Sequence, residues 1–354
     1  MHVKFLPAAG GACLTVLALA AQATSYVVED IGQAMPGAQV VPLAINQAGI
    51  SVGDATLVNS YVQNAVVLGR DRVEVLPRTG TSSTASGINR EGRVVGTMSS
   101  PQHPDRRAFT FVKGDTHPLG TLGGDTSAAR AVNDAGQVVG GSTLKNGFSH
   151  AFLFDDGRMT DLGTLGGQTS EALAINGPGV VVGRAQLRSG DTHAFSWRKG
   201  TMTDLGTLGG NHPGRSSIAR GVNDRGVVTG QSSSAADPAL VHAFRWSADE
   251  GLQDLGTLSG GRNSFGLGVN EDGDIVGGSE IRGREFHAFI VRARGNGKDA
   301  GRGNDKMVDL NDELDKKSGE GWVLTSATAI NDRGQVIGYG TRNGRPAAFL
   351  LTPK

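Results

Sequence analysis

The sequence predicts an all-β fold, a closed seven-bladed β-propeller of four-stranded blades that occupies residues 26–354. Three observations predict it. A sequence unit occurs seven times, each unit carries four short strand patterns, and the segment before the first unit matches a strand that the last unit lacks. Glycine accounts for 55 of 354 residues and no long stretch follows a helical period, as expected for short strands joined by tight turns.

Residues 1–25 have the features of a signal peptide. Lys4 gives a basic start, residues 14–21 are an apolar run, and residues 21–23 form an A-x-A cleavage signal. Cys13, the one cysteine of the chain, leaves with this peptide, so the mature chain has no disulfide. No later stretch approaches the roughly 18 apolar residues that a membrane helix needs. We therefore expect a secreted or periplasmic domain without an integral membrane segment.

The charges are balanced, with 34 Lys and Arg residues against 34 Asp and Glu residues, and no long basic stretch occurs. A nucleic-acid partner is not expected, because such binding needs a surplus of basic side chains to neutralise phosphates. The Gly-rich residues 295–304 lack the flanking strand and helix of a phosphate loop, and we expect no cofactor. We expect a monomer.

Each repeat unit centres on an Asn that follows a small apolar pair. A Gly comes three residues later, and a β-branched run then ends in a second Gly. Successive Asn residues are 43 to 47 residues apart, except for a last interval of 61 residues that predicts an insertion at about 293–320. Within it, residues 311–318 are expected to form a short capped helix. The seven repeat residues are Asn46, Asn89, Asn133, Asn176, Asn223, Asn270 and Asn331.

The rest of each unit supplies an Ala-Phe strand and a strand that ends in Asp-Leu-Gly, as at residues 150–154 and 159–163. Four strands in about 43 residues cannot bury both faces alone, so neighbouring units must stack. Residues 26–31 match the Asp-Leu-Gly strand, which the seventh unit lacks. If they complete the last blade, the ring closes and leaves no exposed sheet edge.

Ring closure also predicts which loops share a face. The small-residue strand before each Asn becomes the innermost strand, and the Asn turns lie on one face of the disc. The linkers between blades and the variable loops between second and third strands lie on the other, where recognition is most expected. The polar candidates for ligand binding on that face are His103, Asp105, His212, Arg215 and Asp237, although a random distribution of polar residues over the surface explains them better.

These motifs resemble the HAF-repeat family of extracellular repeat proteins. The His-Ala-Phe sequence starts at His150, His193, His242 and His287, and Gly-Thr-Leu-Gly-Gly occupies residues 163–167 and 206–210. The resemblance covers residues 26–354 and implies no general activity or ligand. The first, second and seventh units depart from the motif, since their residues at the His position are Asn64, Arg107 and Ala347.

The repeated His and Asp residues favour a structural role over a catalytic one. They are present together in units three to six and vary together in the first two units, as expected of a hydrogen-bonded pair across the third and fourth strands. The seventh unit is an exception, since Ala347 would lie beside Asp30. One His per blade also keeps these side chains too far apart for a metal site, so none is predicted. The expected pairs are His150 with Asp161, His193 with Asp204, His242 with Asp254, and His287 with Asp309.

The seven repeat Asn residues admit two interpretations. A turn-initiating role is favoured, because Gly follows at the third position in every unit. The alternative is that they ring the central channel and offer their amide groups to a ligand or an ion.

Two classes of function remain for the whole chain. The first is an exported binding or scaffolding module whose variable loops contact a protein, a glycan or an envelope component. The second is a hydrolase or lyase that acts on an extracellular polymer through a loop-built site on the same face. No catalytic residue is assigned, because no catalytic motif occurs, and the binding module is the favoured hypothesis.

Overall fold

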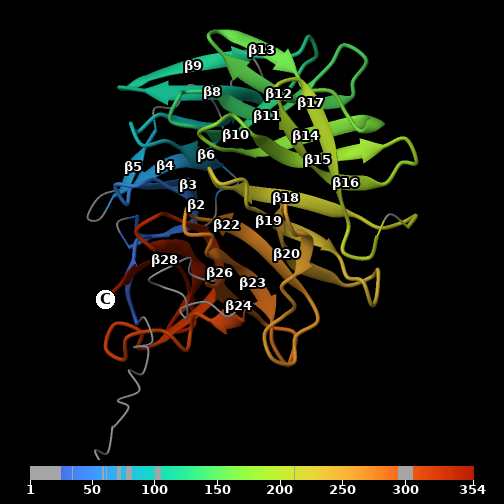
Figure 1. Ribbon diagram of the computed structural model, residues 1–354. Helices are drawn as coiled ribbons and strands as arrows, with labels where there is room; N and C mark the ends of the chain where they lie inside the picture. Colours follow the sequence, from blue (N-terminus) through green and yellow to red (C-terminus); the bar gives the residue numbers. More distant parts are fainter. Residues whose placement is uncertain are drawn as a thin grey trace, which may run out of the picture.

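The computed structural model describes residues 25–33, 35–57, 60, 62–69, 73–76, 82–99, 105–210, 212–293 and 306–354. Three regions named above lie outside the described residues: residues 1–24 of the expected signal peptide, His103, and the Gly-rich residues 295–304. Within them the chain forms 28 strands in seven four-stranded antiparallel sheets, with no helix (Figure 1). The prediction of a seven-bladed propeller is confirmed. None of the described residues belongs to a helix that would cross a membrane.

The blades follow one another along the chain, each running from its innermost to its outermost strand. Blade 1 has β2 (Ala38–Ile45), β3 (Ser51–Leu57), β4 (Gln63–Leu68) and β5 (Val73–Val75). Blade 2 has β6 (Ser82–Ile88), β7 (Val94–Ser99), β8 (Arg107–Val112) and β9 (Asp115–Gly120). Blade 3 has β10 (Ser127–Val132), β11 (Val138–Thr143), β12 (Ser149–Asp155) and β13 (Arg158–Asp161). Blade 4 has β14 (Gly166–Ile175), β15 (Val181–Leu187), β16 (Thr192–Arg198) and β17 (Thr201–Gly206).

The remaining blades keep this order, except that the outermost strand of the last one comes from the start of the chain. Blade 5 has β18 (Ser217–Val222), β19 (Val228–Ser233), β20 (Val241–Ser247) and β21 (Gly251–Asp254). Blade 6 has β22 (Ser264–Val269), β23 (Ile275–Glu280), β24 (Phe286–Val291) and β25 (Met307–Asp309). Blade 7 has β26 (Trp322–Ile330), β27 (Val336–Arg342), β28 (Arg345–Pro353) and β1 (Tyr26–Asp30).

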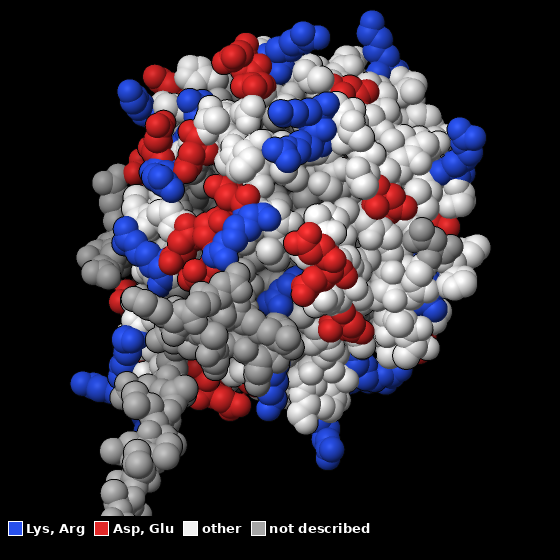
Figure 2. Space-filling model, in the orientation of Figure 1, with Lys and Arg blue, Asp and Glu red and all other residues white. Residues whose placement is uncertain are grey.

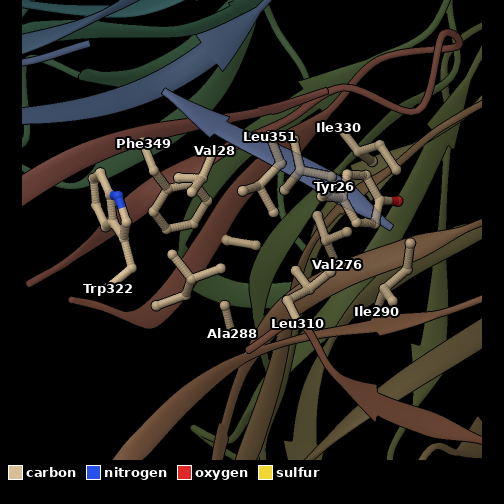
Figure 3. Close-up of a cluster of buried hydrophobic side chains, with 13 residues drawn as sticks. Tyr26, Val28, Val276, Ala288, Ile290, Leu310, Trp322, Ile330, Phe349 and Leu351 are labelled. Atoms are coloured by element: carbon tan, nitrogen blue, oxygen red, sulfur yellow. The ribbon is translucent and has the colours of Figure 1, made fainter. Parts of the chain in front are cut away.

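Strand β1 closes the ring, as predicted. It pairs antiparallel with β28, from Tyr26 opposite Pro353 to Asp30 opposite Phe349. The side chains of Tyr26 and Val28 are 2% and 6% exposed. They pack between blade 7 and blade 6 in a cluster with Trp322, Phe349 and Leu351 of blade 7 and Val276 and Ile290 of blade 6 (Figure 3).

Each innermost strand contains a β-bulge three residues before the repeat Asn. In blade 3 the pairing of β10 with β11 shifts between Ala129 and Ala131, so Arg130 is the extra residue. A bulge turns one side chain out of the regular alternation of the strand. The seven bulge residues all line one cavity in the central channel: Leu43, Ser86, Arg130, Leu173, Arg220, Leu267 and Thr328.

The predicted helix at residues 311–318 is wrong. These residues form turns, apart from an isolated parallel bridge between Leu314 and Tyr26. The Tyr26 N–H donates to the carbonyl of Glu313, and Asn311 exchanges two hydrogen bonds with the backbone of Leu324, at 2.8 and 3.0 Å. Because the Glu313 carbonyl and the Asn311 side chain bond to β1 and β26, they are not available for the hydrogen bonds of a helix at residues 311–318.

Candidate functional site

The four predicted pairs of His and Asp residues are present in blades 3 to 6, one pair in each blade. The Nδ1 atom of each His is 2.6 to 2.9 Å from a carboxylate oxygen of its Asp. In blade 4 the Asp204 carboxylate also accepts the N–H of Gly206, the last residue of β17, so the pair connects the third strand with the end of the fourth. No group of three or more His, Cys, Asp or Glu side chains suited to a metal ion occurs among the residues that the structure describes.

The pair in blade 5 shows the electrostatic coupling of this arrangement. The hydrogen bond with Asp254 raises the pKa of His242, against a weaker opposite effect of burial. Burial raises the pKa of Asp254, but the hydrogen bonds from His242 and from the Gly256 N–H outweigh it and lower that pKa overall. The charged forms of both side chains are therefore favoured in the folded protein.

Replacing His242 and Asp254 by Ala, singly and together, is expected to give non-additive losses of stability, because the second change removes an interaction that is already lost. A coupling of about 0.5–1 kcal/mol is expected for this partly exposed pair. Because the pKa of His242 is raised in the folded protein, protonated His242 stabilises the fold fully below its unfolded pKa of about 6.5. This stabilisation is lost as the pH rises through the pKa of His242 in the folded protein. Because the pKa of Asp254 is lowered in the folded protein, ionised Asp254 stabilises the fold above its unfolded pKa of about 3.9. This stabilisation is lost as the pH falls through the pKa of Asp254 in the folded protein.

Urea unfolding of the four proteins of this cycle measures the coupling. It should be largest near pH ~5.5 and smaller near pH ~9, where neutral His242 retains only an ordinary hydrogen bond. Additive losses, or a coupling that is equal at both pH values, would contradict the pairing.

The repeat Asn residues are 2% to 5% exposed and bond within their own turn and to the next blade. In each turn the N–H of the Gly three residues later donates to the Asn carbonyl at 3.0 to 3.1 Å. The side-chain amide of a repeat Asn donates to the backbone carbonyl of the repeat Asn in the next blade. The amide of Asn46, for example, donates to the carbonyl of Asn89, and the amide of Asn331 in the last blade donates to the carbonyl of Asn46 at 3.1 Å. Six of these contacts are present, at 2.9 to 3.2 Å, and the seventh, from Asn270 to Asn331, is not among the hydrogen bonds of the described residues. These amide groups fasten neighbouring blades to one another.

The structure does not assemble the polar candidates of the variable face into one site. Asp105 precedes β8, His212 and Arg215 lie in the linker before β18, and Asp237 lies between β19 and β20. Arg215 donates to the backbone carbonyl of Ser234, and Asp237 accepts from the N–H of Ala239. The Arg215 N–H donates to the carbonyl of His212 within the same linker, at 3.4 Å. No other hydrogen bond or ion pair joins these four residues to one another within the described parts of the chain.

A polar cleft of about 340 Å³ opens instead between blades 3 and 4, next to the loops at residues 144–148 and 187–191. It lies on the face predicted for recognition, because Ser149 directly follows the first loop, and Gln186 and Thr192 flank the second. Its lining combines hydroxyl, amide and ionised groups from four strands: Ser149, Thr169, Glu171, Arg184, Gln186 and Thr192.

Two residues of this cleft, Glu171 and Arg184, also line the cavity of about 390 Å³ in the central channel. Oε1 of Glu171 accepts from Nε and Nη2 of Arg130, both at 2.8 Å, and Oε2 accepts from Nε and Nη2 of Arg184, at 3.1 and 2.8 Å. Burial raises the pKa of Glu171, but the two arginines outweigh it and lower that pKa overall. The third arginine of the cavity, Arg220, donates from Nε to Gln231 at 3.1 Å.

The charge of this cavity differs from that of the face shown in Figure 2. On the face in Figure 2, acidic and basic side chains are intermingled. In the cavity, the charged lining residues are three arginines and one glutamate. Sequence reasoning missed these residues because it followed positions that recur in every unit. The innermost strands consist mainly of small residues, and the charged residues among them, Arg130, Glu171 and Arg220, are the sequence signal that could have identified the cavity.

The fold is similar to those of solved structures. A puromycin-hydrolyzing peptidase of Mycobacterium tuberculosis matches with a TM-score of 0.59 and 12% identity, over 91% of this chain and 52% of the peptidase chain. The present chain thus spans about half the length of that protein. A gluconolactonase of Xanthomonas campestris has a TM-score of 0.44 and 10% identity, over 93% of this chain and 95% of the other. Comparison with protein-family models and with curated proteins gave no match. At such identities the likeness is one of fold alone.

Proposed function

We propose that this propeller is an exported binding module that recognises its ligand on the face with the variable loops, at the cleft between blades 3 and 4. One observation carries the proposal: the cleft and the channel cavity share Glu171 and Arg184, so polar groups continue from the face into the channel. Concave sites with a few converging polar groups on a rigid scaffold are typical of ligand binding. The partner class is a protein, a glycan or an envelope component.

Two further elements of the proposal come from the sequence. Residues 1–25 direct export, and the chain is a member of the HAF-repeat family. Membership of the family is supported by the His-Ala-Phe segments, which lie on the third strand of four successive blades: β12, β16, β20 and β24.

A binding survey tests the proposed site. The protein, purified from the cell fraction in which it accumulates, is screened against arrayed glycans and envelope extracts, and retained ligands are titrated. Changing Gln186 and Thr192 to Ala together is expected to lower the affinity at least about tenfold, because two hydrogen-bonding groups leave the cleft. The exposed Arg225 in a turn of the opposite face serves as control, and Arg225→Ala should bind as the wild type does.

Equal affinity of the wild type and the cleft variant would place recognition elsewhere and contradict the proposed site. Cleavage of a retained polymer by the purified protein would instead support the hydrolase or lyase hypothesis. Accumulation of the unprocessed chain in the cytoplasm would contradict export.

A further inference from the structure

We propose that the central channel binds an anionic group, a carboxylate or a phosphate, between the guanidinium groups of Arg220, Arg184 and Arg130. This inference rests on the proposed binding function and names the chemical class of its ligand. The three arginines come from three consecutive blades, on β18, β15 and β10, and all line the same cavity of about 390 Å³.

The charges of the residues that line this cavity do not balance. Glu171 is the one acidic residue in its lining, and both of its oxygens are already engaged by Arg130 and Arg184. Three guanidinium groups against one carboxylate leave two positive charges in excess. Arg220 is half-buried and forms no ion pair with a carboxylate among the described residues, so a structural ion pair does not account for it.

Arg220 has free donors for such an anion. Its Nε atom donates to Oε1 of Gln231, while its two Nη groups make no hydrogen bond within the described residues. An arginine offers five N–H donors in a planar fork that matches the oxygens of a carboxylate or a phosphate. The side chains of Arg130 and Arg184 are 43% and 48% exposed, so they remain within reach of a ligand in the channel.

The surroundings of Arg220 strengthen the preference for an anion. Burial lowers the pKa of Arg220, and repulsion from Arg184 and Arg130 lowers it further, against the opposite effect of Glu171. A bound anion would offset both the lost hydration and the repulsion. The apolar side chains of Leu43, Leu173, Leu267 and Ile218 line the same cavity, so it also suits the uncharged body of a ligand that carries the anionic group.

Calorimetric titration of the purified protein tests the inference with three probes, inorganic phosphate, citrate and hexanoate, at ionic strength held constant with chloride. We expect saturable binding of at least one probe. Arg220→Gln should weaken it at least about tenfold, because a charge-assisted fork is lost. Glu171→Gln should strengthen it, since the competing carboxylate is removed. Arg225→Gln is the matched control in a turn of the opposite face and should leave binding unchanged.

The order of the three affinities distinguishes a phosphate ligand from a carboxylate ligand. The absence of saturable binding for all three probes would overturn the inference, as would equal affinities of Arg220→Gln and Arg225→Gln. If the cleft variant loses its retained ligand while no anion binds, the proposed binding function stands and the channel inference fails. If anions bind at Arg220 while the cleft variant keeps its ligand, the channel site stands and the proposed cleft fails.

Discussion

Deletion of residues 26–32 is expected to abolish the cooperative unfolding of the whole domain. The deletion removes β1 and the two residues after it, and with them three buried side chains, Tyr26, Val28 and Ile31. Their burial alone is worth about 4.5–9 kcal/mol, at 1.5–3 kcal/mol for each large apolar side chain. That loss is comparable to the total stability of about 5–15 kcal/mol that is typical of a protein domain. It also exposes Phe349 and Leu351 and leaves β28 as an open sheet edge.

Circular dichroism during heating and in urea measures this effect. A matched control moves residues 26–32 to follow Lys354 through a short turn. The design fits the structure, because β1 runs antiparallel to β28 and the N–H of Lys354 already donates to the carbonyl of Ser25 at 3.0 Å. The rearranged chain should recover a cooperative transition. A deletion variant with the wild-type midpoint would show that β1 adds nothing to the ring.

The architecture was predictable from the sequence because its determinants are local and occur seven times. The Asn-x-x-Gly turn sets each first hairpin, and the match of residues 26–31 to the Asp-Leu-Gly strand identifies the closing segment. Ring closure then follows from the need to cover the last blade. The positions of His193 and Asp204 across β16 and β17 could also be predicted, because two residues that vary together between units indicate a contact within one unit.

Contacts between blades were not predictable in the same way. The amide of Asn46 bonds to a carbonyl 43 residues away, and Glu171 meets Arg130 across 41 residues. Such contacts depend on the stagger of adjacent sheets, which no local pattern encodes. The helix expected at residues 311–318 failed for a related reason, since its capping residue Asn311 bonds to Leu324 instead. The channel cavity was missed because the bulge that turns Arg220 inward is visible only in the strand register.

The Gly that ends the β-branched run of each unit is explained by this bulge, and Gly140 offers a direct test. A Cβ atom at Gly140 would lie 1.9 Å from the carbonyl oxygen of Ala128, and the equivalent distance in all seven blades is 1.9 to 2.1 Å. Backbone atoms cannot move aside as the end of a side chain can. Gly140→Ala is therefore expected to cost about 2–4 kcal/mol, from overpacking and a distorted hydrogen bond between β10 and β11.

The adjacent Gly141 provides the matched control on the same strand. A Cβ atom there would lie 3.4 Å from its nearest neighbours, which are side-chain atoms of Glu171 and Ser149 and are at ordinary contact distance. Gly141→Ala is expected to change the free energy of unfolding by less than about 1 kcal/mol, because Ala costs less chain entropy than Gly and meets no backbone. Urea midpoints for both variants decide the matter. Equal losses would mean that glycine is required throughout β11 for flexibility, whereas a loss confined to Gly140→Ala would show that the close approach at the bulge fixes this residue in every unit.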